Sequence, residues 1–514
     1  MSHRIDRRTL LRTLGTGALV AAAGAPRPAR GQGKPGGTLT FATSALPPNI
    51  EPHMQGLDIW QKRKPLIYEN LVWIDHGLEA KPELAERWEQ GSPTEYVFHL
   101  RRGVKFHDGR ELTAEDVKYS YDRVRDPKVS PGANDLLFIK QIDVVDRHTV
   151  RFTLTGPAAT FLVNLGGKYN GVIPRDAGGD GKALLTRAVG TGPFSVAEFD
   201  PSRRLVLQKH AAYWGAQKPS LDAIVFQAIP DESSIVAGLR TGQVQMAEFS
   251  SALSFRVAKA VSTLDAVQAP STRWVVLDLA GDQEPTSKPE VRLAIALAVD
   301  RAAILQIAGN GLGQRLGVLP PGLKGWALPV QELPNQQRDV ARAKALLQKA
   351  GYTGRVSMKL RNIVGFPALA AAVPVIVDNL KEAGVDVAVE TVDGGVWIKD
   401  WIVPQSPPTM NEWGGFVDPD QALHRHFHSP PGGKDFRRWK SAQADELLDI
   451  GRTTLDRAKR KDVYDRVQRL MAEDPITIPL YSPDLLYVMR KGVTGFQPHP
   501  TGFYYGLRFA SLER

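Results

Sequence analysis

Three histidines at regular spacing are the first residues that suggest chemistry. His424, His426 and His428 alternate with other residues, so on a β-strand their imidazoles would share one face. Neutral imidazole is a ligand that zinc, copper and nickel favour. The alternative is a solvated, partly helical surface patch after Asp418, and no fourth ligand is marked out nearby. We favour the patch, and expect no metal and no cofactor.

The motifs of common enzyme classes are missing from the sequence. It has no Gly-x-Ser-x-Gly nucleophile elbow, no His-Glu-x-x-His zinc motif and no Gly-x-Gly-x-x-Gly after a strand. Carboxylates are numerous, but no pair of them is singled out by its sequence context. We therefore expect that the protein is not an enzyme.

The elements around residue 108 are the clearest along the chain. Apolar residues alternate over 96–100 and again over 104–107, which predicts two strands. Asp108-Gly109 is a tight-turn pair, because glycine adopts positive φ without steric cost. Thr113 is a good N-cap for a helix that runs to Val124 with an apolar stripe.

The same region carries a family resemblance. Residues 84–89 read LAERWE, residues 98–109 read FHLRRGVKFHDG, and residues 112–117 read LTAEDV. This string resembles the signature of solute-binding protein family 5, which contains the dipeptide-, oligopeptide- and nickel-binding receptors of ABC importers. The resemblance implies a protein that captures a small solute and delivers it to a membrane permease with separate ATPase subunits.

The resemblance also implies a fold. It is an α/β, two-lobed fold of the periplasmic-binding-protein kind (type II, large cluster C form), with a subdomain inserted in the first lobe. We place lobe I at 34–270 plus 482–514, the inserted subdomain at about 51–189, and lobe II at 271–481. Hinges would fall at 271–273 and 480–482. A helix over 375–383, Gly384 and a strand from Val385 fit α/β order, and 445–471 predicts one long helix.

The segment from Met410 to Asp420 resembles the family's pocket segment. In the peptide receptors an Asp three residues before an Asp-Pro pair binds the α-amino group of the ligand. Counting back from Asp418 gives Gly415, so that carboxylate is missing. Trp413, Phe416 and Trp397 would instead form an aromatic, uncharged wall, unless Trp413 is a plain core residue.

The family resemblance adds residues from two further regions to the expected site. Met54 and Gln55 follow a Pro-rich loop that is similar to the family's first pocket-edge loop. The dipeptide receptors also hold a carboxylate-binding Arg before a helix that here starts near Val373. The same register puts alanines at 370 and 371, with Arg361 further back.

These site residues indicate the kind of ligand. A buried ammonium without a carboxylate partner is costly, so we expect the ligand to lack a free α-amino group. A neutral or weakly charged glycoside, an opine-like compound or a blocked peptide would fit. If another carboxylate took the amine, it would be Glu412 or Asp418.

The N-terminus reads as an export signal. Residues 1–31 hold a basic start, a short apolar run and a small-residue cleavage site. Arg7-Arg8 resembles the twin-arginine export motif, and the alternative is an ordinary general-secretion signal. Because the twin-arginine route often carries cofactor proteins, an exported cofactor- or metal-dependent enzyme is the alternative function.

Net charge and cysteine content limit the classes of partner and of covalent attachment that we expect for this protein. Removing 1–31 takes away six Arg and one Asp, which lowers the formal charge from +10 to +5. That mild charge argues against a nucleic-acid partner. The chain has no Cys and no other apolar run of membrane-spanning length, so we expect a periplasmic monomer that is neither lipid-anchored nor disulfide-bonded.

Overall fold

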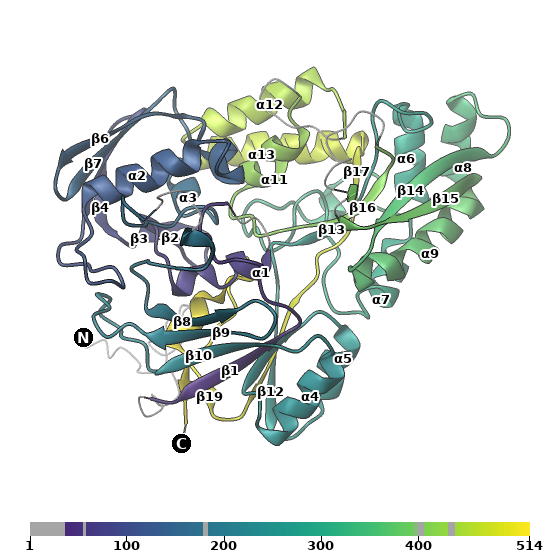
Figure 1. Cartoon of the computed structure of the whole chain (residues 1–514). Coiled ribbons are helices and arrows are strands. Elements are labelled where there is room, and N and C mark those ends of the chain that lie inside the picture. Colours follow the sequence, from purple (N-terminus) through teal and green to yellow (C-terminus); the bar gives the residue numbers. More distant parts are fainter. Residues whose placement is uncertain are drawn as a thin grey trace, which may run out of the picture.

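The computed structural model describes residues 36–54, 58–177, 183–394, 396–397, 406–429 and 437–513. Three larger β-sheets lie within these residues, each with its own helices (Figure 1). Sheets of seven and four strands occupy one side of the molecule, and a sheet of five strands occupies the other.

The seven-stranded sheet draws its strands from both ends of the chain. Its order is β12-β18-β11-β1-β10-β9-β8, and β1 pairs in parallel with β10 and β11. The strands are β1 (Thr38–Thr43), β8 (Phe194–Asp200), β9 (Arg204–Lys209), β10 (Ala223–Ala228), β11 (Met246–Phe249), β12 (Leu264–Ala269) and β18 (Leu485–Arg490). Helices α4 (Glu232–Thr241) and α5 (Ala252–Lys259) pack beside β11.

The four-stranded sheet lies between β1 and β8 in the sequence. Its order is β4-β5-β7-β6, all antiparallel. The strands are β4 (Ala85–Ser92), β5 (Glu95–Leu100), β6 (Ile139–Asp146) and β7 (Thr149–Leu154). Helix α2 (Ala114–Arg125) packs on β6 and β7, and α3 (Phe161–Leu165) contacts β2 (Val72–Ile74), which pairs with β3 (Ala80–Pro82).

The elements predicted around residue 108 are confirmed in part. Thr113 and Asp116 form a capping box at the start of α2, and Gly109 has a φ of +89°. The predicted strand over 104–107 is wrong, because only an isolated bridge joins Lys105 to Glu111. The chain turns back on itself there, with the Phe106 N–H donating to the carbonyl of Arg110, so this run has no neighbouring strand to extend.

The five-stranded sheet has the order β15-β14-β16-β13-β17. Its strands are β13 (Trp274–Asp278), β14 (Val356–Ile363), β15 (Val385–Val392), β16 (Thr409–Trp413) and β17 (Thr477–Tyr481). Its helices are α6 (Pro289–Ala298), α7 (Arg301–Ile307), α8 (Val340–Lys349) and α9 (Pro367–Ala383). As expected, α9 ends at Gly384 in the left-handed region and β15 follows directly.

Three further helices lie between the four-stranded and five-stranded sheets, at the top of Figure 1. They are α11 (Pro419–Phe427), α12 (Ala442–Thr453) and α13 (Arg457–Glu473). The single helix predicted over 445–471 is therefore wrong. The Asp456 carboxylate accepts a hydrogen bond from the Lys459 N–H and caps a new helix there.

The chain crosses between the two large sheets twice, from β12 to β13 and from β17 to β18. The crossings lie side by side, since the Ser482 hydroxyl donates to the carbonyl of Arg273 at 2.7 Å. The predicted hinges fall at these crossings, and their hinge role and the exact lobe bounds stay predictions. Within the described residues, no helix has both the length and the apolar character needed to cross a membrane.

A buried carboxylate at the centre of the five-stranded sheet links β13 to its two neighbouring strands. Asp278 ends β13, and its Oδ1 accepts from Arg437 Nε at 2.7 Å and from Thr477 Oγ1 at 2.6 Å. Its Oδ2 accepts from Asn411 Nδ2 at 2.6 Å and from Trp413 Nε1 at 3.2 Å. Both charges are almost fully buried, so each depends on the other to offset its lost hydration.

We expect Asp278→Asn to destabilise the protein strongly. The change keeps the shape but leaves the Arg437 guanidinium buried without its anion, which costs about 3–5 kcal/mol of the free energy of unfolding. Asp386→Asn is the matched control, because Asp386 also pairs with an arginine, Arg355, through two hydrogen bonds, while both side chains are 49% exposed. Its cost should stay below about 1 kcal/mol. Urea unfolding measures both, and equal losses would contradict the argument.

Candidate functional site

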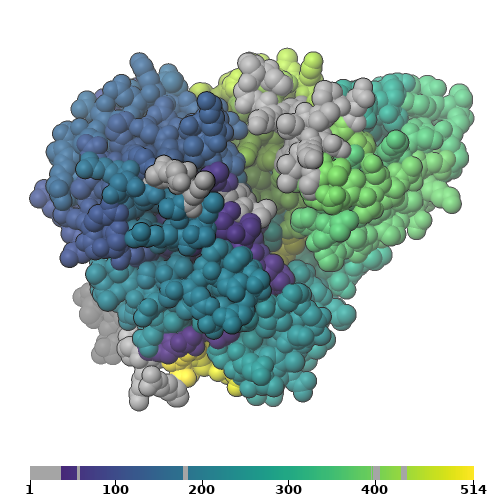
Figure 2. Space-filling view, viewed as in Figure 1, coloured from purple at the N-terminus to yellow at the C-terminus, as the bar shows by residue number. Residues whose placement is uncertain are grey.

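A small cavity lies where the three sheet units meet. Its lining comes from Ile74, Asp135 and 166–168 on one side, from 414–417, Gln421 and Arg425 on the second, and from His499, Thr501, Phe503 and Tyr505 on the third. Its volume is about 40 Å³. Figure 2 shows a recess between the purple and blue atoms and the green atoms on this face.

A larger hollow of about 1150 Å³ lies elsewhere, over β14 and β15. It is shallow, and its described lining comes entirely from residues 282–408, so it belongs to one sheet unit. Ligand sites are enclosed and favour the interfaces between domains. The small cavity therefore is the better candidate.

Glycines shape the wall of this cavity. Gly414 has no room for a side chain, since a Cβ there would lie 2.5 Å from Arg273 Cγ. Gly415 lines the cavity with a φ of +75°, and its nearest neighbour to a Cβ would be Phe503 at 3.9 Å. Gly415 thus leaves open space in the position where the resemblance expects a carboxylate.

The predicted aromatic residues are only partly brought to the cavity. Phe416 lines it, and its ring contacts Trp274 and His426. Trp413 lies behind this wall, with its ring 4.9 Å from His426 at an interplanar angle of 51°, and its indole donates to Asp278. Trp397 contacts Trp413 at 6.3 Å. Neither tryptophan is among the lining residues, so their part in ligand binding stays a prediction.

The other predicted site residues lie outside the lining. Met54 is exposed, and Gln55 lies outside the described residues. The Arg361 guanidinium contacts Glu390 on β15, and Ala370 and Ala371 lie in α9. None of these described residues lies where it could bind a ligand carboxylate in the small cavity.

The carboxylates that might replace the missing one are already paired. Both oxygens of Asp418 accept from Arg460, at 2.6 and 2.7 Å, and Asp418 also caps α11. Glu412 lies 3.1 Å from Arg273. An amine that approached either group would compete with a guanidinium that is itself buried or partly buried.

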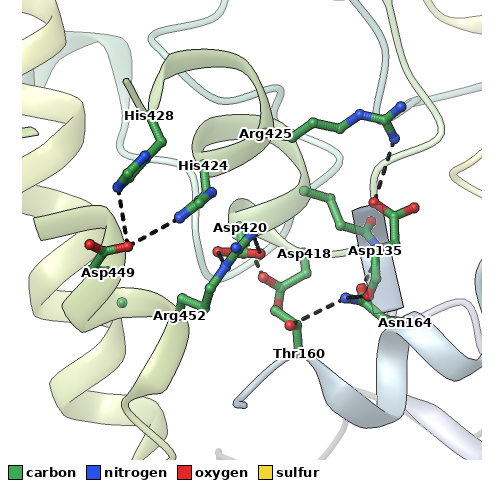
Figure 3. A network of polar contacts seen from close by, with 12 residues as sticks. Asp135, Thr160, Asn164, Asp418, Asp420, His424, Arg425, His428, Asp449 and Arg452 are labelled. Atoms are coloured by element: carbon green, nitrogen blue, oxygen red, sulfur yellow. Dashed lines mark hydrogen bonds and ion pairs between the residues drawn. The ribbon is translucent and has the colours of Figure 1, made fainter. Parts of the chain in front are cut away.

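Two cations in the lining were not found from the sequence. Lys168 follows two glycines in the loop after α3, and Arg425 lies on α11, where its guanidinium is 3.5 Å from Asp135 (Figure 3). Asp135 is the only carboxylate among the described lining residues. The cavity therefore carries more positive than negative charge.

The lining histidine is neutral near neutral pH. Burial and, to a smaller extent, the neighbouring His76 lower the pKa of His499 to about 4. His499 Nε2 donates to the carbonyls of Ile74 and Asp75, at 3.1 and 3.0 Å, which leaves Nδ1 to accept from the Thr501 hydroxyl. His499 thus positions the 499–505 segment without adding charge.

The histidine cluster does not form a strand face. His424 and His426 lie within α11, and His428 caps its end. The helical repeat places His424 and His428 on one face and turns His426 toward Trp413 and Phe416. The strand that would give three imidazoles one shared face is therefore not formed. The patch that we favoured is helical, as expected, but it is not solvated, because His424 and His426 are buried.

Comparison with known proteins agrees with this architecture. Residues 79–434 match the family model for bacterial extracellular solute-binding proteins, family 5. The dipeptide-binding protein of Escherichia coli K12 is 27% identical over 501 residues, which cover 90% of this chain and 93% of that protein.

Two solved structures support the same fold. The binding protein AgaA from A. tumefaciens R10, in complex with agropinic acid, is 29% identical with a TM-score of 0.83, covering 93% of this chain and 99% of that one. The Helicobacter pylori protein DppA, in complex with the peptide STSA, is 26% identical with a TM-score of 0.82, covering 94% and 99%. These similar proteins are binding proteins of transporters rather than enzymes. The predicted two-lobed α/β fold is confirmed.

The matched family model spans more than half of the chain, and the curated relatives match it along most of their length. The chain belongs to family 5 of the bacterial extracellular solute-binding proteins, the solute-binding components of peptide and nickel ABC importers.

Proposed function

We propose that the protein captures an anionic solute without a free α-amino group between its lobes, with a carboxylate of the solute in the small cavity, and delivers it to an ABC permease. The observation that carries this proposal is the charge of the lining. Within the described residues, Arg425 has Asp135 as an ion-pair partner, whereas Lys168 has none. A carboxylate on the solute would supply the missing anion and accept charge-assisted hydrogen bonds.

The carboxylates at the candidate site are already paired with arginines, Asp135 of the lining with Arg425, which argues against free peptides. Gly415 occupies the position where the peptide receptors hold their amine-binding Asp. Asp418 forms an ion pair with Arg460, and Glu412 forms one with Arg273. The relative in complex with agropinic acid supports an acid as ligand. The relatives named for dipeptides and for the peptide STSA support a ligand of similar size.

Hinged closure is part of this proposal. Gln421 on α11 donates to Asn164 on α3 at 2.9 Å, and the Ala159 N–H donates to the carbonyl of Arg452 at 2.9 Å. These contacts join the predicted inserted subdomain to predicted lobe II over the cavity. Opening would break them and expose the cavity, as in other hinged binding proteins. We also infer export through Arg7-Arg8, which lie outside the described residues, and a periplasmic monomer.

Two matched peptide libraries test the ligand class. We expect a mixture of free di- and tripeptides to bind on the order of a thousandfold more weakly than the same peptides with acetylated N-termini, because the buried ammonium finds no partner. Isothermal titration calorimetry at neutral pH measures both. Micromolar binding of the free peptides would refute the proposal.

Lys168→Gln tests the anion. The change keeps most of the length and removes the charge, so affinity for the acetylated peptides should fall by about ten- to hundredfold. Lys118→Gln is the control, because Lys118 forms an exposed pair with Asp122 on α2 and neither residue lines the cavity. Unchanged affinity in Lys168→Gln would remove the main support for an anionic solute.

Gly415 gives a second, independent test. Asn and Asp both tolerate positive φ better than other side chains, and both fit the open space at Gly415. Gly415→Asp should therefore bind the acetylated peptides on the order of a hundredfold more weakly than Gly415→Asn, since only the first adds an anion. Equal affinities of the two variants would show that charge at this position does not select the ligand.

A further inference from the structure

A second cluster of ligating side chains lies on the other face of α11. His424 and His428 are one helical turn apart, with rings stacked at 4.4 Å and 12°. Both Nε2 atoms lie 3.2 Å from Oδ1 of Asp449 on α12 (Figure 3). None of these three residues lines the solute cavity.

The hydrogen bonds of His428 leave an acceptor facing an acceptor. Its Nδ1 lies 2.7 Å from the carbonyl oxygen of Ser429, which can only accept, so Nδ1 carries the proton. In the neutral ring Nε2 is then a bare lone pair, directed at a carboxylate oxygen 3.2 Å away. Such a pair is stable only with a cation between the two atoms, either a second proton or a metal ion.

The neighbour His424 brings a second imidazole to the same carboxylate oxygen. Its Nε2 also lies 3.2 Å from Oδ1 of Asp449, so three ligating atoms converge on one point. Two imidazoles and one carboxylate, with water in the fourth position, are a common ligand set for zinc.

The distances suit a tetrahedral ion. Zinc lies about 2.0–2.1 Å from imidazole nitrogen, so two ligand atoms of a tetrahedron stand about 3.3–3.4 Å apart. The two nitrogen–oxygen distances are both 3.2 Å, and all three ligand atoms lie within 4.8 Å of one another. The Ser429 carbonyl would act as the outer partner that orients a ligating imidazole.

The cluster is also accessible. The Asp449 side chain is 62% exposed, so an ion can enter from solvent and keep water as its fourth ligand. The nearest cation, Arg452, binds both oxygens of Asp420 at 3.1 and 3.0 Å, which offsets its charge. The second neighbouring acid, Asp445, accepts from the Ser429 N–H at 2.9 Å and holds the end of α11 in place.

We propose that His424, His428 and Asp449 bind one divalent transition-metal ion, with zinc fitting the donor set best, and that this ion joins α11 to α12. The site replaces the expectation of no metal at the histidine cluster. Its ligands also differ from the three-histidine site considered from the sequence, because His426 is excluded and Asp449 is added. It is independent of the solute proposed above.

Zinc titration of untagged, chelator-treated protein tests the site. We expect one Zn²⁺ per chain by elemental analysis and calorimetry, together with a rise in melting temperature, since an ion that binds only the folded state stabilises it. His428→Ala and Asp449→Asn should each weaken binding by at least about tenfold and remove the rise. Asp449→Asn changes an exposed side chain, so folding is not at risk. Ca²⁺, which prefers oxygen ligands, should produce no shift.

The control is His148→Ala. His148 also lies beside a carboxylate, with Nε2 3.6 Å from Glu111, but no second imidazole joins that pair. Its zinc affinity should match the unsubstituted protein. The proposal is overturned if no Zn²⁺ binds, if Asp449→Asn and His428→Ala both bind it unchanged, or if His148→Ala loses it equally.

Discussion

A buried charge must be neutralised where it is buried, and in this chain that constraint decides which charges remain for a solute. Asp278 shows it at the centre of the five-stranded sheet, where the carboxylate receives hydrogen bonds from Arg437, Thr477 and Asn411. The fourth donor group, the Trp413 indole, links the wall behind the cavity to the same carboxylate. The core of the sheet and the back of the candidate site therefore depend on the same carboxylate, that of Asp278.

The same constraint acts on α11. Asp418 and Asp420 in its first turn are bound by Arg460 of α13 and Arg452 of α12. These ion pairs hold the helix in place and neutralise its two carboxylates. The charged side chain that α11 presents to the cavity is therefore Arg425. The positive balance of the cavity thus follows from the packing of the helix. A binding protein that holds an acid needs such a surplus before the ligand arrives.

The sequence predicts the features that depend on local chemistry. The cap at Thr113, the turn at Gly109 and the stop of α9 at Gly384 are confirmed, because each needs a particular residue type at one position. The strand over 104–107 fails because alternation does not reveal whether a neighbouring strand exists.

The candidate site was harder to predict. Lys168 and Arg425 come to the same cavity only after 256 residues of intervening chain are folded, and nothing in their local sequence marks them. Asp418 was visible by resemblance, yet its partner Arg460 was not, and that partner decides whether the carboxylate is available. The histidine spacing was visible as well, but its meaning depended on helix or strand, which the Asp-Pro start of α11 settles in favour of helix.

Helix α11 therefore carries two separate chemistries on two faces. Arg425 reaches Asp135 across the cavity, while His424 and His428 face Asp449 on the opposite side (Figure 3). Coupling between the faces would require the helix to shift, because a bound ion changes the solute affinity only if it distinguishes two positions of α11. The two Asp–Arg pairs at its start oppose such a shift. The geometry thus favours an ion that stabilises the α11–α12 contact over one that regulates solute binding.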